Sequence, residues 1–98
     1  MADSQITDDD LKPLDNAPLT RRLILTNSQI TDDGLSHLKN LKRLKNLDLT
    51  GNKNITDAGL VHLEGLNELN QVVLIGTQVT PVGVKRLQSK LPKAKILF

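Results

Sequence analysis

A six-residue motif occurs four times in this chain of 98 residues, and no other feature constrains the fold as strongly. The copies begin at Ile6, Ile30, Ile55 and Val79, so their starts are 24, 25 and 24 residues apart. Self-similarity at such a period is typical of repeat architectures, in which each copy is one unit that stacks on its neighbours. We therefore expect a single domain over residues 1–98, with repeats that start near residues 6, 30, 55 and 79.

Each unit combines two apolar periods. After the motif, apolar residues recur at every third position, as at Leu35, Leu38 and Leu41, and later at alternate positions, as at Leu47 and Leu49. The first spacing predicts a helix and the second a strand. A strand of about five residues cannot bury its apolar side alone, so the strands of neighbouring units should pair in a parallel sheet over one continuous core. The predicted fold class is therefore α/β, and no single repeat should fold alone.

The second and third motif positions indicate where each helix begins. Threonine holds the second position in every copy and suits an N-cap, whose hydroxyl accepts a hydrogen bond from a first-turn amide. These threonines are Thr7, Thr31, Thr56 and Thr80. The next residue is aspartate in three copies, where it complements the helix dipole, and Pro81 in the fourth, where proline is favoured. We interpret the acidic runs 8–10 and 32–33 as stabilising helix starts rather than as catalytic or metal-binding carboxylates.

The repeat also resembles the leucine-rich-repeat family, whose units carry an L-x-x-L-x-L-x-x-N block. The matching residues are Leu44, Leu47, Leu49 and Asn52. Two other copies end in Ser28 and Thr77, which can still offer a side-chain oxygen to the turn. The I-T-D-x-G-L signature is similar to the cysteine-containing-type subclass, although the chain has no cysteine.

This resemblance covers residues 5–98 and carries expectations about architecture and role. It implies a right-handed solenoid of about four repeats. A short curved parallel sheet would form the concave side and the helices the convex side. It also implies that the protein binds a partner.

The first repeat departs from the others. Asp10 stands where later copies have glycine, and Pro13 lies far enough into the helix to end or kink it. Pro18 follows soon after. We expect residues 1–20 to form an irregular N-terminal cap and residues 91–98 a C-terminal capping strand, because terminal repeats must cover a core edge.

Side chains between the buried strand positions should point onto the concave face, in three rows that cross the sheet. Alignment of the copies places Arg22, Asn46, Gln71 and Lys95 in the first row, Ile24, Asp48, Val73 and Leu97 in the second, and Thr26, Thr50 and Ile75 in the third. Aliphatic side chains with a polar surround often mark an interaction site, although β-branched residues are also good strand formers. The predicted partner-binding residues are Arg22, Ile24, Asn46, Asp48, Gln71, Val73, Ile75, Lys95 and Leu97.

The sequence has no pattern typical of an enzyme or a metalloprotein. It lacks cysteine, a P-loop, a G-x-S-x-G turn and an H-E-x-x-H helix. His37 and His62 share a repeat column, but the other copies have Pro13 and Arg86 there and no carboxylate column completes a ligand set. We expect no enzymatic activity, no metal site and no cofactor.

Charge and apolar runs bear on nucleic-acid and membrane partners. The net charge is +2, and residues 51–98 hold six Lys and Arg against three acidic residues. Phe98 is the only aromatic residue, so stacking platforms are lacking and nucleic acid is not an expected partner. No apolar run approaches the roughly 20 residues that span a bilayer. The first five residues lack the basic flank and apolar stretch of a secretion signal, so we expect a cytoplasmic protein.

Together these observations favour a non-enzymatic interaction module that binds a protein or peptide on its concave face. An alternative is a structural subunit or fragment of a larger assembly or repeat array, associated through the edge of the last strand. A third hypothesis is nucleic-acid binding through the surface from Lys85 to Lys95. We expect a monomer or a weak homodimer through the C-terminal edge.

Overall fold

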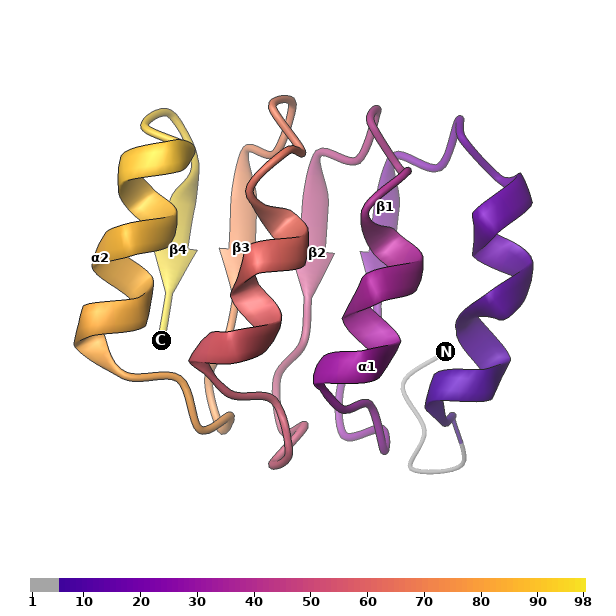
Figure 1. The fold of residues 1–98 in the computed structure, drawn as a ribbon, viewed down its shortest axis with the longest axis horizontal. Coiled ribbons are helices and arrows are strands. Elements are labelled where there is room, and N and C mark those ends of the chain that lie inside the picture. The colour runs from indigo at the N-terminus through magenta and orange to yellow at the C-terminus, as the bar shows by residue number, and fades with distance from the viewer. Residues whose placement is uncertain (1–5) are drawn as a thin grey trace.

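The computed structural model describes residues 6–98, in which helical segments and strands alternate along the chain (Figure 1). The helical segments are η1 (Asp8–Asn16), α1 (Asp32–Leu35) with its continuation η2 (Ser36–Leu38), η3 (Asp57–Leu63) and α2 (Pro81–Lys90). The strands are β1 (Arg22–Ile24), β2 (Asn46–Asp48), β3 (Gln71–Val73) and β4 (Lys95–Leu97). The first five residues of the expected N-terminal cap lie outside the described range.

The four strands form one parallel sheet in the order β1-β2-β3-β4, and the helical segments cover one face of it (Figure 1). Each strand follows its own helix and lies beside the strand of the preceding unit, with the right-handed crossover that parallel strands favour. The expected α/β solenoid with four stacked units is therefore confirmed.

The strands are shorter than expected, with three residues instead of about five. Backbone hydrogen bonds between repeats nevertheless continue past them, from Leu49 N to Val73 O and from Gly51 N to Ile75 O, each 2.8 Å. The chain then turns through left-handed backbone at Asn27, Gly51 and Gly76, whose φ angles are 52°, 82° and 81°. These turns end the extended backbone early and direct the chain back towards the helical side.

Leucine columns between the sheet and the helices make up the core. Leu38, Leu63 and Leu87 are completely buried on successive helical segments, and Leu47 and Val72 on adjacent strands face them. Burial of this kind requires contact with a neighbouring unit, because each layer is only one helix and one strand thick. The stack of repeats, rather than any single repeat, therefore supplies the hydrophobic stabilisation.

Buried polar groups in the turns are matched by the backbone. Asn52 is fully buried, and its Nδ2 donates to the carbonyl oxygens of Leu25 and Leu49 while its Oδ1 accepts from Ile30 N. The third repeat has threonine instead of asparagine at this position, and Thr77 Oγ1 accepts from Val79 N at 3.4 Å. At the last position of the leucine-rich block, asparagine and threonine side chains thus both form hydrogen bonds with the backbone of the turn.

The helix starts follow the predicted capping pattern in three of the four copies. The side chains of Thr31, Thr56 and Thr80 accept hydrogen bonds from first-turn amides, whereas Thr7 forms a capping box with Asp10. Pro81 occupies the first position of α2, as expected. Of the two effects expected of Pro13, ending or kinking the first helix, the first does not occur, because η1 continues past it to Asn16 as 3-10 helix.

The motif aspartates do more than complement a helix dipole, because each binds the threonine of the following repeat. Asp32 Oδ1 accepts from Thr56 N at 2.8 Å and its Oδ2 accepts from Thr56 Oγ1 at 2.5 Å. Asp57 repeats this contact with Thr80 at the same distances, and Asp8 makes it with Thr31. We call these three contacts the Asp–Thr ladder.

The Asp–Thr ladder also explains the glycine of the motif. A Cβ on Gly59 would lie 2.3 Å from Asp32 Oδ1, and Gly34 and Gly83 face Asp8 and Asp57 just as closely. In the first repeat, Asp10 replaces the glycine of the later copies. Its Oδ2 accepts from Thr7 N at 2.9 Å. Asp10 thus supplies from within its own repeat the acceptor that later repeats receive from their predecessor.

We predict that Gly59→Ala destabilises the protein by about 1–3 kcal/mol, although alanine normally favours a helix over glycine by about 1 kcal/mol. The added methyl group would collide with the Asp32 carboxylate. It would also lie only 2.9 Å from Leu35 Cδ1, so it cannot avoid the carboxylate by moving towards Leu35. Urea unfolding followed by circular dichroism measures the change. Gly65→Ala is the matched control, because only the mobile end of Lys42 lies near, at 3.2 Å. Equal stability of the two variants would contradict this account.

Candidate partner-binding surface

The sheet face opposite the helices presents the predicted rows in the predicted register. Strand pairing aligns Arg22 with Asn46, Asn46 with Gln71, and Gln71 with Lys95. The same pairing aligns Ile24, Asp48, Val73 and Leu97 in a second row. We call this surface the concave face; its third row, Thr26, Thr50 and Ile75, follows the strands.

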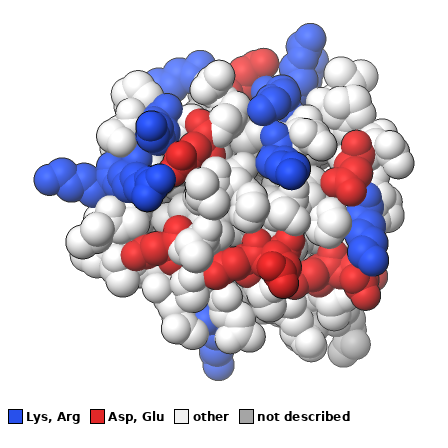
Figure 2. All heavy atoms as spheres, in the orientation of Figure 1, with Lys and Arg blue, Asp and Glu red and all other residues white. Residues whose placement is uncertain are grey.

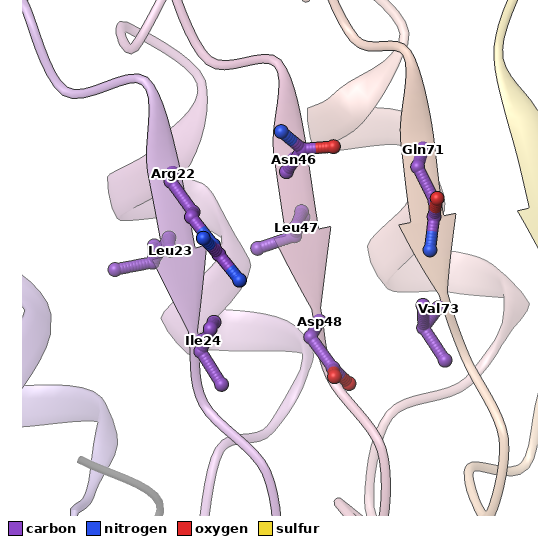
Figure 3. Close-up of a pocket in the computed structure, with 8 residues that line it drawn as sticks. All are labelled: Arg22, Leu23, Ile24, Asn46, Leu47, Asp48, Gln71 and Val73. Atoms are coloured by element: carbon purple, nitrogen blue, oxygen red, sulfur yellow. The ribbon is translucent and has the colours of Figure 1, made fainter.

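A shallow hollow of about 330 Å³ lies on the concave face over β1, β2 and β3 (Figure 3). Six of the predicted partner-binding residues line it, together with Leu23 and Leu47. The six are Arg22, Ile24, Asn46, Asp48, Gln71 and Val73. Lys95 and Leu97 lie in the same rows on β4 but outside the hollow, and Ile75 lies beyond the end of β3.

Asp48 stands between two aliphatic side chains in the second row, Ile24 on β1 and Val73 on β3. Its Oδ1 accepts hydrogen bonds from Thr50 N at 3.0 Å and from Thr50 Oγ1 at 2.6 Å. These two bonds fix the side chain, and Figure 3 shows its carboxylate turned towards the hollow. The floor of the hollow therefore combines one oriented hydrogen-bond acceptor with apolar flanks.

The aliphatic side chains of the concave face differ in exposure. Ile75 is 50% exposed and Ile24 is 38% exposed, whereas Val73 and Leu97 are half-buried. Apolar surface is consequently offered at two separated places, with Val73 between them. A partner with more than one apolar side chain would match this arrangement better than a single bulky group.

A second surface, which was not predicted from the sequence, lies along the connections that follow η1, η2 and α2, whereas the connection after η3 carries Glu64 and Glu68 instead. Nine exposed basic residues gather along these three connections, and we call them the basic edge. They are Arg21, Arg22, Lys39, Lys42, Arg43, Lys45, Lys90, Lys93 and Lys95. The opposite edge, at the helix starts, carries Asp8, Asp9, Asp10, Asp32, Asp33 and Asp57.

This separation of charge is visible on the helical side of the molecule. Figure 2 shows a band of acidic side chains below the middle of this face, and above the band most of the basic side chains with a few acidic ones among them. Repeat columns could have indicated the separation, because every helix-to-strand connection reaches the same edge of a solenoid. Charge compared between the two halves of the chain does not reveal this edge, because Arg21 to Lys45 and Lys90 to Lys95 fall in different halves.

The two histidines do not form part of a metal site in the described part of the chain. His37 Nδ1 lies 3.3 Å from Asp15 Oδ2 of the preceding helix, and both histidines are half-buried. Within residues 6–98, no three His, Cys, Asp or Glu side chains are close enough together to hold a metal ion. In the same range, no helix has the length and apolarity that a bilayer crossing requires.

Four stacked helix-and-strand units of this kind define the fold as a leucine-rich-repeat solenoid. A family model described as Leucine Rich repeat matches residues 21–39 and 40–63. A solved leucine-rich-repeat protein of Leptospira interrogans is similar in fold, with a TM-score of 0.57 and 22% sequence identity. That similarity covers 80% of this chain and 25% of the other, so this chain spans a quarter of its neighbour's length. Comparison with curated proteins gives no match.

The chain is thus similar to leucine-rich-repeat proteins in part of its sequence and in its fold. The matched residues run from β1 of the first unit, through the whole second unit, to η3 of the third. Proteins of this family generally serve as interaction modules without enzymatic activity.

We predict that Ile75→Asp changes the free energy of unfolding by less than about 0.5 kcal/mol, because a half-exposed side chain at the end of a strand loses little packing. Leu47 on β2 points into the core instead. Leu47→Asp should lower the free energy of unfolding by more than about 4 kcal/mol, because it buries an unpaired carboxylate. Thermal melting by circular dichroism distinguishes the two variants. Unfolding of the Ile75→Asp variant would show that this side chain belongs to the core.

Proposed function

We propose that the protein is a non-enzymatic interaction module that binds a protein or peptide partner on the concave face. The hollow over β1, β2 and β3 is the observation that carries this proposal, because it combines donors, one fixed acceptor and apolar side chains in a single surface. Arg22, Asn46 and Gln71 offer donors along one side, and Asp48 offers an acceptor in the middle. Such mixed surfaces are typical of protein-binding sites.

The size of the concave face limits the partner that it can hold. Four parallel strands spaced about 4.8 Å apart give a sheet only about 15 Å wide. A stable interface between globular proteins usually buries about 800 Å² on each partner, which is more than this face offers alone. We therefore propose a peptide segment or a small protrusion as the occupant.

We also propose that the chain is related to the cysteine-containing-type subclass of leucine-rich repeats. The support is the I-T-D-x-G-L signature, whose threonine, aspartate and glycine act together in the Asp–Thr ladder. Residues 1–20 and 91–98 are proposed to cap the two ends of the core, consistent with the substitution of Asp10 for glycine and of Pro81 for aspartate.

We predict that Ile75→Asp abolishes capture of the partner from native extract by the immobilised protein, because a carboxylate would replace apolar contact at the exposed end of the concave face. Quantitative mass spectrometry of the captured proteins measures the loss. Val82→Asp is the matched control, since Val82 is 79% exposed but lies on α2. Loss of capture with Val82→Asp alone would place binding on the helical side and contradict the proposal.

A second candidate function is assembly into a longer array through the outer edge of β4, which pairs with no strand in residues 6–98. Head-to-tail extension would place Lys95 of one copy beside Arg22 of the next in the first row. Like charges directly opposite each other disfavour strand pairing.

Because of this repulsion we expect a monomer in solution. Light scattering at increasing protein concentration should give a constant mass. A mass that rises with concentration would favour assembly through β4, and Lys95→Glu should then strengthen it.

A further inference from the structure

We propose that the partner segment is extended and acidic, and that it aligns along the strands with its acidic residues against the basic edge. This inference rests on the proposed binding at the concave face and adds the chemistry and direction of the partner. The residues that join the two surfaces are Arg22 and Lys95, which belong both to the basic edge and to the first row of the concave face.

Nine basic residues at the basic edge outnumber the acidic residues beside them, which are Asp15, Glu64 and Glu68. The ion pairs of residues 6–98 join Lys12 to Asp9, His37 to Asp15, and Arg86 to Glu64. None of them involves a residue of the basic edge, and two of them occupy acidic groups near it. Nine exposed cations without an ion pair favour an anionic partner, and their field would also increase its rate of association.

The spacing of the rows determines how a peptide could match them. Neighbouring rows are two residues apart along each strand, which is about 6.6 Å. In an extended peptide, residues i and i+2 on the same face are separated by the same distance. Across the strands the spacing is about 4.8 Å, which fits neither one nor two residues of an extended chain. A peptide parallel or antiparallel to the strands therefore stays in register with the rows.

The chemistry along this direction changes from cationic to apolar. Next to the first row, with Arg22 and Lys95, lies the second row with Ile24 and Val73, and Ile75 lies beyond it. An acidic side chain over the first row is thus followed, two residues on, by an apolar side chain over the second. A backbone amide of the same segment can donate to Asp48, whose Oδ1 already accepts from Thr50.

Asp48 also argues against a polyphosphate in the same place. A carboxylate in the middle of the hollow repels a phosphate backbone, whereas a peptide supplies amide donors to it. Phe98 is the only aromatic residue of the chain, so unpaired bases would find no row of aromatic rings to stack on. The apolar side chains Ile24 and Ile75 contribute to binding only if the partner has apolar groups of its own.

The test uses a fluorescent peptide with a run of glutamates followed by alternating valine and threonine, and anisotropy as the readout. We expect the wild-type protein to bind this peptide. At physiological salt, the variant Lys42→Glu/Arg43→Glu/Lys45→Glu should bind it with an affinity lower by a factor of about ten or more. The matched control reverses three cations away from the basic edge, Lys12→Glu/Lys53→Glu/Lys85→Glu. It should stay within about threefold of wild type, because salt screens distant charges. A peptide with serine in place of glutamate should bind as weakly as the basic-edge variant does.

Three results would overturn the inference. Equal binding by the basic-edge variant and wild type would show that the edge plays no part. No binding of the peptide by wild type, together with partner capture that Ile75→Asp abolishes, would reject an acidic extended segment and leave the proposed function standing. Tighter binding of a DNA duplex or of phosphatidylserine vesicles than of the peptide, lost in the basic-edge variant, would assign the edge to nucleic acid or to a membrane surface instead.

Discussion

The contact between consecutive repeats is the interaction on which the rest of this structure depends. Each unit is one helical segment and one strand, too thin to bury its own leucines, so every core column is buried only because a neighbour covers it. The Asp–Thr ladder adds directional bonds to this stacking, from Asp8, Asp32 and Asp57 to the next threonine. Hydrophobic burial alone would allow the units to slide, whereas these bonds hold consecutive helix starts in register.

The same ladder decides where charge is left for other purposes. It gathers aspartates at the helix starts, where three of them are already bonded to the next repeat. The opposite edge receives the helix-to-strand connections, whose basic residues form no ion pair within residues 6–98. The geometry of one repeating contact thus separates acidic and basic surfaces on a chain whose net charge is only +2.

Much of the fold and part of the candidate site could be predicted because the repeat columns translate directly into spatial neighbours. Alignment of the copies placed Asn46 beside Arg22 and Val73 beside Asp48, and strand pairing has the same register. The strand length was overestimated, because left-handed turns at Asn27, Gly51 and Gly76 end the extended backbone. The partner of each motif aspartate was also missed, because its threonine lies 23 or 24 residues further along the chain.

The sequence by itself determined the number of units, the alternation of helix and strand, and the side chains that face away from the core. These properties follow from local spacing of apolar residues and from residue preferences at helix starts. Only the tertiary structure decided that Asp32 binds Thr56 and that Gly59 leaves the space which the Asp32 carboxylate occupies. It also decided that Arg22 and Lys95 lie at one edge with Arg43. The physical reason is that the stacking of repeats brings together residues that no local pattern connects.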